Sequence, residues 1–303
     1  MQTTLSLTKR NIKMFFKDKT MLFTSLITPI ILLVLYVTFL AKVYKDSFTL
    51  NLPEGFVVSD KLINGMVGGE LFSSLLAVSC VTVAFCANML MVTDKISGAR
   101  KDFYITPVKK SSLAISYYLG TLFTTLIVSL VAIAASFIYL SIIGWFMSFG
   151  DVLLILLDTL LLTMFGTAFA CIVNMFLTSQ GQVSSVGTIV SAGYGFVCGA
   201  YMPISQFGAG LQKILMFLPG TYGTSLIRNH SLNGVYKQMA KENFPPEVVE
   251  AIKDSVDCNL YFFNKKVSVG AMYAVLIGAI ILLIGGYILI NYLRSNKKRM
   301  IKK

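Results

Sequence analysis

The sequence predicts an all-α integral membrane protein with six transmembrane helices, an N-terminal amphipathic interfacial helix and re-entrant outer helices after the fifth span. Two observations favour this class. Of the 303 residues, 55% are hydrophobic and only 13% are charged, whereas soluble domains have about 25% charged residues. The apolar residues also cluster in continuous runs of roughly twenty, which is the length needed to cross a bilayer as a helix.

Six such runs predict a single transmembrane domain over residues 1–303. The predicted spans are 21–41, 68–92, 112–143, 152–177, 183–203 and 268–292. Sixteen basic residues, against three acids, lie before the first span, in the 93–111 loop and after the last span. Basic segments remain in the cytoplasm. We therefore expect a multi-pass protein of the cell (plasma) membrane with both termini cytoplasmic, which six spans permit.

Residues 1–19 favour a helix that lies in the membrane interface. Leu5, Thr8, Ile12, Phe15 and Phe16 share one face, and Lys9, Arg10, Lys13 and Lys17 cluster on another. Such a helix can place its apolar side in the membrane and its basic side among anionic headgroups. A basic topology signal that happens to be helical explains the pattern equally well.

The loop between the second and third spans carries five basic residues. We predict a cytoplasmic coupling helix within residues 93–110, capped by Thr93 or Asp94 and stopped by Pro107. Ile96, Ala99 and Phe103 would then lie on one stripe. A charged helix with one apolar stripe suits contact with a cytosolic protein.

The end of the fifth span is broken by Gly193, Gly195, Gly199 and Pro203. A second apolar piece, from Phe207 to Leu218, is too short to cross the bilayer. We predict a re-entrant piece here, with an ordinary interfacial helix as the alternative. The rest of the 204–267 region, from residue 221 onward, reads as an outer polar segment with a short helix after Pro245 and Pro246.

Catalytic chemistry is scarce in this sequence. It lacks a GxxxxGK[ST] phosphate loop, and its one histidine, His230, falls in the polar segment where a solvated side chain is expected. We therefore expect no enzyme and no metal site. Asp158, Asn88 and Asn174 are polar residues within spans, where such residues line a pathway or bond helices together. Glu70 is expected at headgroup level.

Several short motifs carry a resemblance to a known family. Ile105-Thr106-Pro107-Val108 is similar to its "TPV" element, and Cys198 to Pro203 followed by Leu218-Pro219-Gly220-Thr221-Tyr222 is similar to its "G-x-x-x-P" and "L-P-x-T-Y" elements. The chain resembles the membrane (permease) subunit of an ATP-binding-cassette exporter of the type-2 permease class, which includes drug-resistance, polysaccharide and teichoic-acid exporters. It departs from the family where Glu-Arg-Glu-x-Gly-Thr is usual, since residues 93–99 retain only one acid and the glycine.

The resemblance implies a homodimer or a heterodimer with a related permease in the lipid bilayer, with the first, second and fifth spans lining the route. Separate cytosolic ABC ATPase subunits would bind ATP and Mg, leaving no cofactor on this chain and no nucleic acid partner. The cargo would be a hydrophobic or amphipathic molecule moved outward: a drug, an antimicrobial peptide, a lipid or a lipid-linked glycan. The alternative is an ion-coupled secondary transporter or channel that uses Asp158.

The candidate residues fall into three groups. The ATPase-coupling candidates are Asp94, Ile96, Gly98, Ala99, Arg100, Phe103 and Pro107; the outer-gate candidates are Gly199, Pro203, Phe207 and Pro219; the possible polar residues of the pathway are Asn88, Asp158 and Asn174.

Overall fold

The computed structural model describes residues 2–35, 38–39, 41–42, 45–46, 58–106 and 108–300. Pro107 lies outside them. The described elements are α1 (Gln2–Lys17), α2 (Lys19–Leu35), α4 (Asp60–Ile96), α5 (Ala99–Ile105), α6 (Lys110–Ile143), α7 (Phe149–Asn174), α8 (Gln180–Val197), η2 (Ile204–Gln206), α9 (Ala209–Leu215), α10 (Pro219–Lys241), α11 (Pro246–Ser255), β1 (Tyr261–Phe262), β2 (Lys265–Lys266) and α12 (Val269–Met300).

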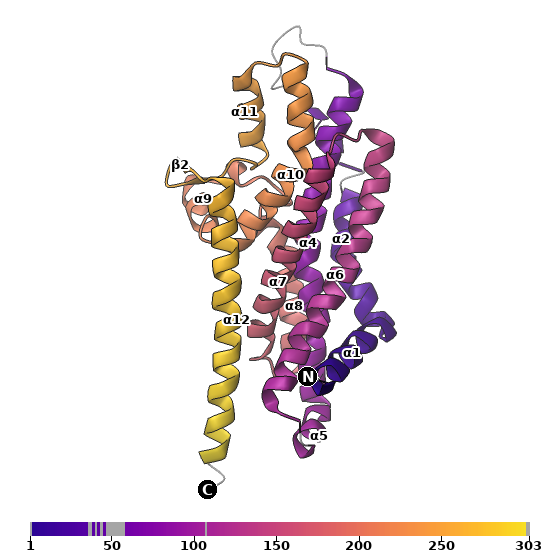
Figure 1. The fold of residues 1–303 in the computed structure, drawn as a ribbon, viewed down its shortest axis with the longest axis vertical. Coiled ribbons are helices and arrows are strands. Elements are labelled where there is room, and N and C mark those ends of the chain that lie inside the picture. Colours follow the sequence, from indigo (N-terminus) through magenta and orange to yellow (C-terminus); the bar gives the residue numbers. More distant parts are fainter. Residues whose placement is uncertain are drawn as a thin grey trace.

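The long helices run side by side along one axis, so the bundle has two distinct ends (Figure 1). Both termini and α5 lie toward one end, which we call the proximal end. The loop after α10 and the helix α11 lie at the other, which we call the distal end.

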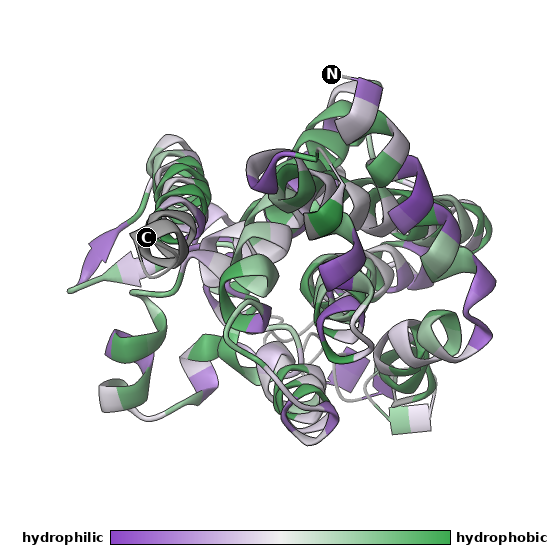
Figure 2. Cartoon of the chain, turned by 90° about the horizontal axis from the view of Figure 1, so that it is seen from below, coloured by the Kyte–Doolittle hydropathy of each residue, from purple (hydrophilic) through white to green (hydrophobic). Residues whose placement is uncertain are grey.

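Four described helices, α4, α6, α7 and α12, are long and apolar enough to cross a membrane. Helix α2 is apolar but shorter within the described residues, and its predicted continuation to residue 41 falls partly outside them. Hydrophobic residues occur along the length of the helices (Figure 2), and many large ones are exposed, among them Phe23, Ile142 and Leu282, as lipid contact requires. The predicted all-α membrane class is therefore confirmed, apart from a two-residue antiparallel ladder between β1 and β2.

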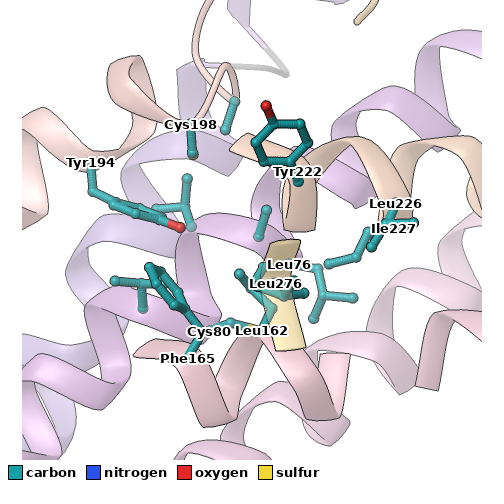
Figure 3. Packing of buried hydrophobic residues seen from close by; sticks show 14 of the residues in the cluster. Leu76, Cys80, Leu162, Phe165, Tyr194, Cys198, Tyr222, Leu226, Ile227 and Leu276 are labelled. Carbon is teal, nitrogen blue, oxygen red and sulfur yellow. The ribbon is translucent and has the colours of Figure 1, made fainter. Parts of the chain in front are cut away.

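Helix α4 is the centre of the bundle. Its most apolar stretch is 94% buried, whereas the equivalent stretch of α12 is only 17% buried. It packs against α2, α6, α7, α8 and α10. The α7 backbone approaches α4 closely at Gly166, which has no side chain. A Cβ at this position would lie only 2.8 Å from the carbonyl oxygen of Cys80. Side chains from α4, α7, α10 and α12 fill the core, among them Leu76, Leu162, Leu226 and Leu276 (Figure 3).

The N-terminal helix forms as predicted, but it buries only part of the expected face, together with Asn11. Thr8, Asn11 and Phe15 are buried, whereas Leu5 is 71% exposed. The reason is that α1 packs against α6 through a polar contact, in which the Asn11 amide donates to the Ser116 carbonyl oxygen at 3.1 Å. The helix is therefore joined to the bundle as well as shaped for an interface.

The expected outer polar segment is wrong in its first half. Residues 219–241 form α10, a helix that is buried over most of its length. Small residues allow this burial, because a Cβ at Gly234 would overlap the carbonyl oxygen of Phe146. The second half follows the prediction, since α11 begins at Pro246 with Glu247 in its first turn.

Candidate transport site

A groove with a volume of about 1050 Å³ lies between α2, α4 and α8. These helices correspond to the first, second and fifth predicted spans. Apolar side chains form much of its wall, including Ile27 and Leu32 from α2, Met89 from α4 and Val183 from α8. Helix α8 presents Ile189 and Phe196 at 70% and 49% exposure, so the groove borders a largely uncovered apolar surface.

The polar groups of the groove are nearly all uncharged. Its lining includes the hydroxyl or amide side chains of Thr20, Thr24, Thr28, Thr93, Gln180, Ser184, Thr188 and Ser191. The acid in the lining is Asp18, between α1 and α2, where its carboxylate accepts from the Met21 N–H at 3.0 Å. Such a surface accommodates a mainly apolar molecule and offers it scattered hydrogen bonds.

Three helices meet through a charged network at the proximal end. Arg10 of α1 forms a two-pronged ion pair with Asp94 of α4, one prong measuring 2.9 Å between Nη2 and Oδ1. Tyr117 of α6 donates to the same carboxylate at 2.6 Å. The hydrogen bond with Asp94 raises the pKa of Arg10. A bidentate arginine–carboxylate pair fixes relative orientation, so this network holds α1 against α4 and α6.

The single coupling helix expected within residues 93–110 is not observed. Helix α4 continues through Thr93 and Asp94 to Ile96, so neither residue is an N-cap. The chain breaks at Ser97, and Gly98 precedes α5 with φ of +86°. Glycine adopts this conformation without the penalty that a Cβ brings. The carboxylate of Asp94 is already bonded to Arg10 and Tyr117, so it is not available to cap a new helix.

The other coupling candidates therefore lie on two helices instead of one stripe. Ile96 ends α4 and is 43% exposed. Phe103 lies on α5, half-buried against a cluster that includes Leu113 and Tyr117, with the Arg10 guanidinium 5.4 Å from its ring centroid. Ala99 and Arg100 form the first turn of α5 and are both half-buried.

At the distal end, Arg228 of α10 joins segments that are far apart in sequence. Its side chain is 1% exposed. It donates to the Val256 carbonyl oxygen at 2.7 Å, to the Ser74 hydroxyl at 2.8 Å and to the Gly199 carbonyl oxygen at 3.0 Å. Its Nη1 lies 3.8 Å from the Asp257 carboxylate. A single guanidinium therefore links α10 to α4, to the end of α8 and to the segment after α11.

The outer-gate candidates lie along the segment between α8 and α10, and one of them contacts this arginine. Gly199 has φ of +75° and supplies one of its acceptors. Pro203 precedes η2, whose Ile204 N–H donates to Asp257 at 2.5 Å. Phe207 follows η2 and packs against the main core, and Pro219 is the first residue of α10. The structure thus brings these residues into one connected region between α8 and α10.

A second buried network joins α7, α10 and α12. Both oxygens of Asp158 are bonded: Oδ2 to His230 Nδ1 at 2.6 Å and Oδ1 to the Tyr273 hydroxyl at 2.5 Å. Asp158 is fully buried and His230 is 9% exposed. The expectation of a solvated His230 is wrong because α10 carries it into the bundle. Glu70, which was expected at headgroup level, is 2% exposed within the bundle.

Asn88 and Asn174 bond across helices, as residues of this type do within spans. The Asn174 amide donates to the Asn88 side-chain oxygen at 3.2 Å, and the Asn88 amide donates to Thr121 at 3.0 Å. Both asparagines are 1% exposed. Neither they nor Asp158 belong to the lining of the groove.

A family model described as ABC-2 type transporter matches residues 2–230. The chain belongs to this family. It is therefore a transmembrane component of an ABC transporter, a permease and not a nucleotide-binding domain, and members of the family typically pair with an ABC ATPase. A search of curated proteins gave no match to this permease.

Sequence reasoning missed two residues that organise this permease. Arg228 and His230 fall in a stretch whose polarity indicated an outer loop. The available signal was the row of small residues around them, at Gly220, Gly223, Ser225 and Gly234, which suits close helix packing. Neither residue belongs to the lining of the groove, and both bond one helix to another.

Proposed function

We propose that this chain is one of two permease subunits of an ATP-driven ABC exporter of the plasma membrane. The dimer, homomeric or formed with a related permease, moves a hydrophobic or amphipathic molecule outward along the face that carries the groove. The candidate cargo classes remain a drug, an antimicrobial peptide, a lipid or a lipid-linked glycan. Separate cytosolic ATPase subunits bind ATP and Mg and supply the energy.

The distribution of basic residues supports the proposed orientation of the chain in the membrane. The basic segments before α2, around α5 and at the end of α12 all belong to the proximal end, and the positive-inside rule assigns that end to the cytoplasm. Helices α2, α4, α6, α7, α8 and α12 are then the six spans. The segment from η2 to α9 is the re-entrant piece, since its elements are too short to cross.

The groove is the observation that carries the proposal. It lies beside an apolar surface of α8, so a second copy placed against that surface would close it into a pathway. Its lining of apolar and hydroxyl groups suits cargo that partitions into lipid. Segment 97–106, next to the Arg10–Asp94–Tyr117 network, is the proposed contact with the ATPase.

Transport in proteoliposomes that contain the permease and its ATPase tests this proposal. A fluorescent amphipathic dye and a fluorescent phospholipid serve as probes. Ser184→Trp fills the groove and should abolish ATP-dependent movement, while Ile281→Trp, on the exposed face of α12, should leave it unchanged. Equal transport by both variants, or transport without ATP, would exclude this route.

The ion-coupled alternative predicts that a charge at Asp158 is required. Because both carboxylate oxygens are already bonded to His230 and Tyr273, we favour a role in joining helices. Asp158→Asn retains an acceptor for Tyr273 and should preserve ATP-driven transport. Transport driven by a proton or sodium gradient, and lost in Asp158→Asn, would favour the alternative.

A further inference from the structure

An aromatic patch lies on the surface where α9 meets the β-hairpin. We call it the hairpin patch; it comprises Leu211, Ile214, Phe217, Phe262 and Phe263. The Phe217 ring lies 5.2 Å from the Phe262 ring and 6.2 Å from the Phe263 ring, measured between centroids. Phe217, Phe263 and Ile214 are 62%, 58% and 62% exposed. Large apolar side chains gathered on a surface mark an interaction site.

The hairpin turn places Phe263 outward, in a backbone conformation that phenylalanine disfavours. Phe263 and Asn264 connect β1 to β2, and both have positive φ, at +46° and +66°. A two-residue hairpin of this kind favours Asn-Gly, and a bulky residue at positive φ is strained. Phe262 packs against the core while Phe263 projects from the tip. Strain retained at an exposed aromatic residue points to a role outside the fold.

The patch lies at the level where lipid tails end. Helix α12 begins at Val269, three residues after β2, and its apolar stretch runs for 25 residues to Leu293. At about 1.5 Å per residue this stretch exceeds the roughly 30 Å hydrocarbon thickness, so its first turn reaches the membrane boundary. Figure 1 shows α9 and β2 beside this end of α12, while α11 and the end of α10 extend farther.

The surrounding chemistry matches lipid headgroups. Lys213 of α9 and Lys265 of β2 are exposed on the two elements that meet at the patch, and Lys266 Nζ is held by Glu250 at 2.8 Å. Phenylalanine and leucine side chains of interfacial segments enter the headgroup–acyl boundary, and lysines on the same segments can reach phosphates. Helix α12 packs against α6, α7 and α10, whereas the groove is formed by α2, α4 and α8. The patch therefore adjoins the lipid-facing side.

We propose that the hairpin patch is a membrane anchor, with Phe217 and Phe263 inserted at the headgroup–acyl boundary of the distal leaflet. Its partner is the phospholipid surface itself, through apolar contact from the rings and attraction of phosphates to Lys213 and Lys265. Phe217 precedes Pro219 by two residues, so the anchor fixes the depth at which α10 begins. The assignment is independent of transport and of the cargo.

Tryptophan fluorescence in nanodiscs tests the anchor. The chain has one tryptophan, so Trp145→Phe provides a blank background. In that background Phe263→Trp, and separately Phe217→Trp, should emit at shorter wavelength and lose about half of their intensity with phospholipids brominated near the top of the acyl chain, as a boundary position requires. The matched control is Glu247→Trp on α11, which should be insensitive to bromolipid and quenched by aqueous iodide.

Two results would overturn the proposal. If Phe263→Trp and Phe217→Trp are quenched by iodide and ignore bromolipid, as the control does, the patch faces water. If they emit at short wavelength but ignore bromolipid, and the shift is lost when the nanodiscs hold a single copy, a second protein chain covers the patch. Quenching by bromolipid at both positions in single-copy nanodiscs supports the anchor.

Discussion

Individual buried polar residues determine how the helices of this permease are joined. Arg228, Asp158 and Asp94 each bond to at least two other elements, and each is nearly or fully buried. A charge buried in this way is costly unless its partners satisfy it. Removing Arg228, for example, damages more than the bonds it makes, because the Asp257 carboxylate stays in the interior.

Arg228 offers the clearest test. Arg228→Met keeps an unbranched side chain but leaves Asp257 buried without its counter-charge. Breaking a buried pair in this way commonly costs about 3–5 kcal/mol, so we expect a large fall in melting temperature in detergent. Arg228→Lys retains the charge and should lose less. Lys241→Met, at the exposed end of α10, is the control. Equal melting temperatures for Arg228→Met and this control would contradict the role of Arg228 in joining these segments.

Glu250 should make the β-hairpin sensitive to acid. Hydrogen bonds from Lys253 and Lys266 lower the pKa of Glu250 from 4.5 to about 2. A lowered pKa in the folded state stabilises the hairpin above pH 4.5, and this contribution is lost as pH falls toward 2. The side chain is half exposed, so the effect is local and screened by salt.

Pepsin cleavage between Phe262 and Phe263 can measure this effect, because pepsin is active in the same acidic range. Protection of the bond should fall between pH 4.5 and pH 2 in the natural protein. Glu250→Gln should be cut faster at the upper end and change less with pH. An identical pH profile for both proteins would show that the ion pairs do not hold the hairpin.

At the scale of elements, the break between α4 and α5 determines how the proximal end is built. Gly98 adopts φ of +86°, and an added Cβ would contact nothing within 4 Å. Gly98→Ala should therefore cost about 1 kcal/mol through backbone conformation alone. Hydrogen exchange should show faster opening of α5.

Gly193→Ala is the matched control for this change. It also meets open space, but it lies inside α8 without a positive φ, so alanine should stabilise the helix by up to about 1 kcal/mol. The two substitutions should therefore have opposite signs. Equal effects would mean that the break at Gly98 does not depend on the left-handed conformation.

The sequence predicted elements well where hydropathy alone determines them. α6 and α7 begin and end within three residues of their predicted spans, and α12 begins within one residue of its predicted start, because long apolar runs have one stable arrangement in lipid. Prediction from the sequence failed where tertiary contacts determine the structure. Asp94 resembled a helix cap, but its bonds to Arg10 and Tyr117 keep it inside α4. The polarity of α10 resembled a loop, because the partners that satisfy Arg228 and His230 come from distant segments.

The candidate site was less predictable than the fold for the same reason. The three helices around the groove were expected from the resemblance, but their lining residues depend on helix rotation, which hydropathy does not specify. Asn88, Asp158 and Asn174 were considered for the pathway because they are polar within spans. The structure turns all three toward other helices, where Asn174 donates to Asn88 and Asp158 bonds to His230 and Tyr273.

At the scale of the whole molecule, the exposed face of α8 should meet the second subunit. In a background where Cys86 is replaced by alanine, Ile189→Cys should form an oxidant-induced cross-link between two permease chains. Ile189 is 70% exposed, and the five native cysteines are buried. Leu282→Cys on α12, 76% exposed, is the control and should remain uncross-linked. The reverse pattern would place the dimer interface on the α12 side.

The enclosure of α4 also has a mechanical consequence. A close-packed helix cannot shift without displacing every neighbour, so we expect α4 to keep its position during the transport cycle. Motion then belongs to the periphery, where α2 and α8 border the groove. Spin labels on α4 and α7 should keep one separation with and without ATP, while labels on α2 and α8 should change theirs. ATP-driven movement at the proximal end would thus change the positions of α2 and α8 relative to a stationary α4.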